Sequence, residues 1–102
     1  MTIIKTYLVS IQGKIFKLLP MREERAFGID NHLTEYVTNI CDNFDSEAEC
    51  RPELSSLREI AEVQANLWFL RANIDCDFAK WRSIILRSVR LIQSVLERNY
   101  KE

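Results

Sequence analysis

The strongest signal in the sequence is a periodic row of large apolar side chains near its C-terminal end. The row advances in steps of 3, 4, 4, 3, 4 and 4 residues: Phe78, Trp81, Ile85, Val89, Ile92, Leu96 and Tyr100. This spacing lines one face of a helix, and Asp77 stands where an N-cap is favoured. The pattern predicts a helix over 77–99, and a helix this amphipathic must bury its apolar face against other elements.

Two further stretches, 29–46 and 54–73, carry helical apolar stripes. The chain has 102 residues but only two glycines and two prolines, too few turn formers for a β-sandwich or barrel. We therefore expect a single, mainly α domain over 1–102, built as a three-helix antiparallel bundle. Five aromatic side chains are expected to dominate its core: Tyr36, Phe44, Trp68, Phe78 and Trp81.

The first twenty residues fit two structures. Tyr7, Val9 and Ile11 alternate with polar residues, and Gln12-Gly13 can form the turn of a β-hairpin. A helical stripe fits the same segment: Ile4, Tyr7, Leu8, Ile11, Ile15 and Leu18. Because Gly13 and the many β-branched residues lower helix propensity, we favour an extended or β-hairpin segment over 1–20. Pro20 is expected to end it in either case.

Charge changes sign along the chain. Residues 1–26 sum to +3, residues 27–62 to −7 and residues 63–102 to +3, which together give the net charge of −1. This layout indicates that the basic ends fold against the acidic middle, or that different faces meet different partners.

The cellular compartment is expected to be the cytoplasm. The N-terminus lacks the pattern of a signal peptide, and no apolar stretch approaches the ~20 residues of a spanning helix, so no membrane partner is expected. The three cysteines, an odd number without short spacing, favour reduced thiols over a disulfide.

Catalytic and metal-binding patterns are missing from the sequence. His32 is the only histidine, and no paired-cysteine or paired-histidine ligand motif is present. Acidic neighbours of Cys50 and Cys76 disfavour their thiolates, and the two glycines form no phosphate-binding loop. We therefore expect no enzyme activity, no catalytic residue, no metal and no cofactor.

The helix predicted over 54–73 is apolar nearly all round, which favours a protein interface. Arg71 and Arg82 fall within apolar arcs, where interface arginines are common. The expected interface residues are Val63, Leu67, Phe69, Leu70, Arg71 and Arg82.

We interpret the chain as a small non-catalytic helical protein that acts through protein–protein contacts: an adaptor, assembly factor, inhibitor or accessory factor. It is expected to form a homo-oligomer, most simply a dimer, and to bind an unidentified protein partner. Its compact form would suit a phage or mobile-element product.

A nucleic-acid-associated regulator is the alternative interpretation. Five bases gather on the polar side of the helix predicted over 77–99: Lys80, Arg87, Arg90, Arg98 and Lys101. An exposed basic row of this kind can follow a phosphate backbone. The competing interpretation is favoured: a solvated helix face, or ion pairs with acids of the helix predicted over 29–46, such as Glu35 and Asp42.

Overall fold

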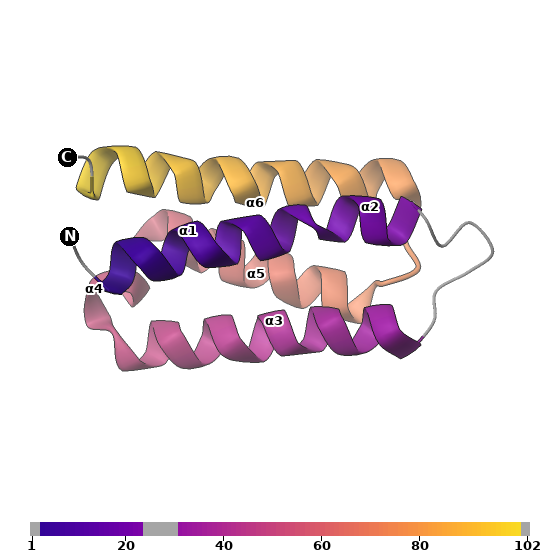
Figure 1. The fold of residues 1–102 in the computed structure, drawn as a ribbon, viewed down its shortest axis with the longest axis horizontal. Helices are drawn as coiled ribbons and strands as arrows, with labels where there is room; N and C mark the ends of the chain where they lie inside the picture. Colours follow the sequence, from indigo (N-terminus) through magenta and orange to yellow (C-terminus); the bar gives the residue numbers. More distant parts are fainter. Residues whose placement is uncertain (1–2, 24–30, 101–102) are drawn as a thin grey trace.

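The computed structural model describes residues 3–23 and 31–100. Every regular element within these residues is a helix (Figure 1). The bounds are α1 Ile3–Phe16, α2 Leu18–Glu23, α3 Asn31–Cys50, α4 Pro52–Ser55, α5 Arg58–Ala72 and α6 Phe78–Asn99. The prediction of a mainly α protein is confirmed.

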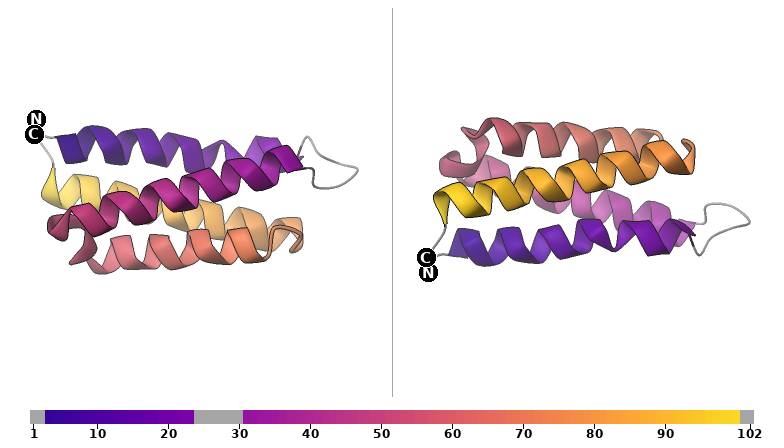
Figure 2. Two further views of the ribbon diagram at one scale, coloured as in Figure 1. Left: turned by 90° about the horizontal axis from the view of Figure 1, so that it is seen from below. Right: turned by 90° about the horizontal axis from the view of Figure 1, so that it is seen from above.

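The four long helices, α1, α3, α5 and α6, surround one core. They run alternately in opposite directions along a body of 43 × 22 × 20 Å, with α2 continuing the line of α1 (Figures 1 and 2). α1 packs against α3 and α6, and α5 packs against the same two helices. α1 and α5 therefore lie diagonally across the core. The bundle therefore has four long helices instead of the expected three, and the fourth is α1.

The predicted hairpin over 1–20 is wrong, because residues 3–16 are helical. One face of the segment buries Ile4, Leu8, Ile11 and Ile15, and Leu18 continues this face into α2. Complete burial of such a side chain stabilises a fold by roughly 1.5–3 kcal/mol. A central glycine costs a helix only about 1 kcal/mol relative to alanine. Burial against α3 and α6 therefore outweighs the local preference for extended structure.

Pro20 interrupts the N-terminal helix but does not end it, contrary to expectation. Proline has no N–H, so it cannot donate to the carbonyl four residues earlier, that of Phe16. The helical bonding resumes with the Met21 N–H donating to the Lys17 carbonyl. The result is a break at Lys17 and a short second helix, α2, which carries the chain on to Glu23.

The three predicted helices are present, with shifted ends. α3 continues to Cys50 instead of fading after residue 46, and the stretch expected from residue 54 divides into α4 and α5. Pro52 occupies the first turn of α4, where a missing N–H costs least. The predicted N-cap of α6 is confirmed: the Asp77 carboxylate accepts a hydrogen bond of 3.0 Å from the Lys80 N–H. Residues 29 and 30 lie outside the described residues.

The core contains fewer aromatic side chains than expected. Trp81 and Phe44 are fully buried, whereas Tyr36 is half-buried and Phe78 and Trp68 are exposed. The Trp81 indole N–H donates to the Leu18 carbonyl at 3.2 Å and so ties α6 to α2. Aliphatic residues from α1, α3, α5 and α6 fill the rest of one continuous cluster.

Candidate interaction surfaces

Three of the predicted interface residues are core residues. Val63, Leu67 and Leu70 are buried within the single chain, so they form no outer face on α5. Phe69 is partly buried, and the Lys80 ammonium lies 5.2 Å above its ring. The expected apolar patch disappears because α1 supplies the fourth long helix, and α5 can then bury a wide arc inside the bundle.

The two predicted interface arginines are separate from each other. Arg71 forms an ion pair of 3.4 Å with Asp42, within a polar seam between α5 and α3. Gln64 belongs to the same seam and donates to Asp45 Oδ1 at 2.7 Å. Arg82 is exposed on α6. Both arginines are exposed, and Arg71 joins two helices of one chain.

A second apolar row lies on the outward side of α5. Its members recur at the helical spacing of 4, 3 and 4 residues, and all are exposed: Ala61, Ala65, Trp68 and Ala72. We call this row the α5 stripe. Trp68 is 51% exposed, yet its indole N–H is held by both Asp45 oxygens at 3.1 and 2.8 Å. The ring is therefore fixed in place on the surface, as an anchor side chain requires.

The outward side of α1 and α2 carries a matching row. The spacing is again 4, 3 and 4, and all members are exposed: Val9, Gly13, Phe16 and Pro20. We call this row the α1 stripe. Val9 is 51% and Phe16 50% exposed, although the inward face of α1 already fills its share of the core. Because other residues of α1 already fill the core, Val9 and Phe16 do not contribute to packing inside the chain.

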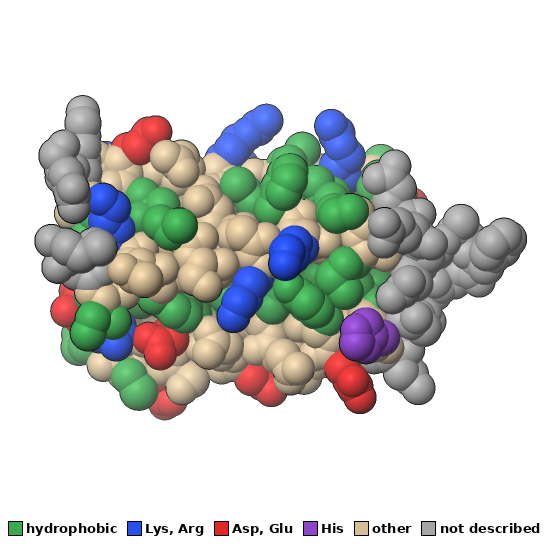
Figure 3. Space-filling model, viewed as in Figure 1, with side chains coloured by type: hydrophobic (Ala, Val, Ile, Leu, Met, Phe, Trp, Pro, Cys, Tyr) green, Lys and Arg blue, Asp and Glu red, His purple; other side chains and the backbone are tan. Residues whose placement is uncertain are grey.

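The α1 stripe lies in basic surroundings. Residues 3–22 include Lys5, Lys14, Lys17 and Arg22 but no Asp or Glu, whereas α3 has no Lys or Arg and carries Glu35, Asp42, Asp45, Glu47 and Glu49. On the face seen in Figure 3, basic and hydrophobic side chains mix across the middle, and acidic ones lie toward the margins. An opposing surface would need acidic groups to match this face.

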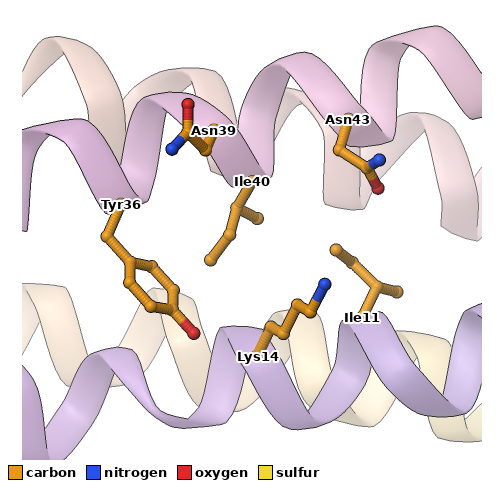
Figure 4. Close-up of a pocket in the computed structure, with 6 residues that line it drawn as sticks. All are labelled: Ile11, Lys14, Tyr36, Asn39, Ile40 and Asn43. Carbon is orange, nitrogen blue, oxygen red and sulfur yellow. The ribbon is translucent and has the colours of Figure 1, made fainter.

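A hollow of about 340 Å³ opens between α1 and α3. Ile11 and Lys14 reach into it from α1, and Tyr36 and Ile40 reach toward them from α3 (Figure 4). At the same seam, the Tyr7 hydroxyl donates to Asn43 Oδ1 at 2.8 Å. Burial, with a smaller effect of nearby acids, raises the pKa of Tyr7 above its ordinary value, so its phenol stays protonated. The hollow therefore presents one cation and neutral hydrogen-bonding groups above an apolar floor.

A second hollow, of about 270 Å³, lies beside Trp68. It is lined by Asp45, Ala48, Glu49, Ser55, Gln64 and Trp68. Both of its charged side chains are carboxylates, and Glu49 is exposed. The surroundings of the α5 stripe on this side are thus acidic, opposite in sign to those of the α1 stripe.

Two bases of the predicted nucleic-acid row are engaged within the chain. Arg87 pairs with Glu62 and Arg98 pairs with Glu59, each at 2.5 Å, so both reach acids of α5. Lys80 lies over Phe69, while Arg90 is exposed. Lys101 lies outside the described residues. The expectation that the acids of residues 29–46 would pair with this row is not met, because the partners come from α5.

The thiols and the histidine lie apart from one another. Cys41 is buried, and its thiol donates to the Leu67 carbonyl at 3.0 Å. Burial raises the pKa of Cys41 to about 11, which keeps it protonated near neutral pH. Cys50 and His32 are exposed, at opposite ends of α3.

Cys76 has a basic neighbour, Arg22, that the sequence did not predict. The Arg22 guanidinium donates to the Cys76 carbonyl, lies 3.8 Å from its sulfur and stacks over the Trp81 ring at 4.9 Å. All three cysteines are free.

Within residues 3–23 and 31–100, no group of three or more His, Cys, Asp or Glu side chains is placed to hold a metal ion. No described helix combines the length and apolar character needed to cross a bilayer.

Sequence reasoning missed both stripes, although their 4, 3, 4 spacing is visible in the chain. The signal was a second apolar row on the side of each helix away from its main stripe. Comparisons with protein-family models, characterised proteins and solved structures gave no match.

Proposed function

We propose that this protein works by binding other protein surfaces through its bundle, without catalysis, as an adaptor, assembly, inhibitor or accessory factor. The observation that carries the proposal is the α1 stripe, where Val9 and Phe16 stay half exposed beside a filled core. Exposed apolar groups that exceed the needs of the core commonly mark contact sites. The surrounding lysines add charge-based selection of the partner.

Photo-crosslinking in the cell that makes the protein tests this proposal. A benzophenone amino acid replaces Phe16, and a control places it at Arg90, which is exposed on α6. We expect defined protein adducts from position 16 and none from position 90. The proposal fails if position 16 yields no protein adduct, or the same adducts as position 90.

Nucleic-acid binding is the second candidate, favoured by the exposed bases Arg82 and Arg90 on α6. Binding to a generic duplex would weaken steeply with salt, because phosphate contacts release counterions. Fluorescence anisotropy with a labelled duplex at two salt concentrations measures this. Absence of binding at low salt removes the candidate.

A further inference from the structure

The two outward stripes lie on opposite sides of the bundle. α1 and α5 are diagonal, and in the view of Figure 1 α1 lies toward the viewer and α5 behind it. One copy can therefore offer its α1 stripe to a second copy while its own α5 stripe stays accessible. A contact between unlike faces needs no rearrangement of either bundle.

The stripes complement each other in size. Each contains one aromatic side chain among smaller ones, at the same spacing. An antiparallel alignment sets every large residue against a small one: Val9 with Ala72, Gly13 with Trp68, Phe16 with Ala65, and Pro20 with Ala61. Gly13 matters most here, because a Cβ built on it meets nothing within 4 Å. No contact within the chain requires glycine, and the space above it can accept the fixed Trp68 ring.

The stripes also complement each other in charge. Pairing two α1 stripes would set lysines against lysines, since residues 3–22 contain no acid. Pairing two α5 stripes would bring together the hollows that Asp45 and Glu49 line. Pairing an α1 stripe with an α5 stripe sets the basic segment against the side of the α5 stripe that Asp45 and Glu49 make acidic, which favours association there, while Arg58 and Arg71 of α5 are exposed as well.

We propose that a second copy of this chain docks its α5 stripe, with Trp68 over Gly13, on the α1 stripe of the first. The inference rests on the proposed function and names the partner as the protein itself. Each copy uses a different face, so one stripe stays free at either end of a pair and assembly continues beyond the dimer.

Sedimentation velocity from about 1 µM to about 1 mM protein measures the association. Gly13→Leu adds a large side chain at an exposed position where a Cβ meets nothing within 4 Å, and we expect it to weaken association at least about tenfold. Trp68→Ala removes the opposing anchor and should weaken it similarly. Ser83→Leu, which adds the same side chain at an exposed position of α6, is the matched control and should leave association unchanged.

Mixing the two weakened variants gives the sharpest outcome. The Gly13→Leu chain keeps an intact α5 stripe, and the Trp68→Ala chain keeps an intact α1 stripe. The mixture should form a one-to-one dimer that does not extend, while each variant alone should associate at least about tenfold more weakly than the wild type. A monomeric wild type at all concentrations overturns the inference, as does association that Gly13→Leu leaves unchanged. If Trp68→Ala weakens association but Gly13→Leu does not, the contact joins two α5 stripes symmetrically instead. A monomer that still gives adducts with other proteins from position 16 refutes this inference only.

Discussion

Gly13→Ala distinguishes a helix from a hairpin over the first residues of the chain. In the structure Gly13 lies inside α1, its φ is outside the left-handed region, and a Cβ would meet nothing within 4 Å. Alanine is favoured over glycine in a helix by about 1 kcal/mol, and no steric cost offsets this gain. We therefore expect the free energy of unfolding to rise by about 1 kcal/mol.

A gain of this size is measurable by thermal or urea unfolding followed by far-UV circular dichroism. For a domain of about 100 residues, 1 kcal/mol shifts Tm by about 4 °C or more. The experiment uses low micromolar protein, where self-association contributes least. Ser10→Ala, at another exposed position of α1, is the control and should raise stability by about 0.5 kcal/mol or less.

If residues 1–20 formed a hairpin, Gly13→Ala would lower the free energy of unfolding instead of raising it. A two-residue turn at Gln12-Gly13 would hold Gly13 in the left-handed region, where alanine costs about 1–2 kcal/mol. A Tm that falls with Gly13→Ala would refute the helical assignment of residues 3–16. It would also remove the α1 stripe on which the proposed contact depends.

Three further predictions follow from burial and hydrogen bonding. Ile15→Ala should lower the free energy of unfolding by about 2–5 kcal/mol in urea denaturation, because Ile15 is fully buried. Val9 is half exposed, so Val9→Ala should lower it by less than about 0.5 kcal/mol. Equal losses for the two variants would contradict the orientation of α1. Asp77→Ala removes the N-cap of α6 and should cost about 1 kcal/mol, whereas Asp77→Asn should retain most of the stability. In the folded protein at pH 8, Cys50 should react rapidly with a thiol-specific chromogenic reagent and Cys41 should not, because burial raises the pKa of Cys41 to about 11; rapid labelling of Cys41 mapped by mass spectrometry would disprove its burial.

Helix positions were predictable wherever burial and local preference agreed. In α6 the apolar row and the Asp77 cap indicate the same helix, and both its type and its start are confirmed. In α1 they disagree, because Gly13 and the β-branched residues favour extended structure while the row from Ile4 to Ile15 fits a helix. The outcome depends on α3 and α6 covering that row, which no local pattern contains.

The error in α1 explains the error in the predicted interface. With three helices, Val63 and Leu70 exceed what the bundle can bury and look like a surface patch. With α1 as a fourth long helix they become core, and the residues left outside are those of the α5 stripe. Identifying the outer surface of one helix therefore required knowing how many helices surround the core. The sequence could establish the apolar rows but not which of two rows on one helix faces inward.

The bases of α6 illustrate the same dependence on the neighbouring helices. In the sequence alone, these bases gather on one polar side of the helix, an arrangement suited to phosphates. In the bundle, α5 places Glu62 beside Arg87 and Glu59 beside Arg98, so a phosphate would have to displace a carboxylate at each of these positions. The α1 stripe differs because no acid of its own segment lies among its lysines. Within residues 3–23 and 31–100, no carboxylate pairs with Lys14 or Lys17 in the way that Glu62 and Glu59 pair with Arg87 and Arg98. An acidic surface, including the one that α3 and α5 present on another copy of the chain, gains more by meeting α1 than by meeting α6.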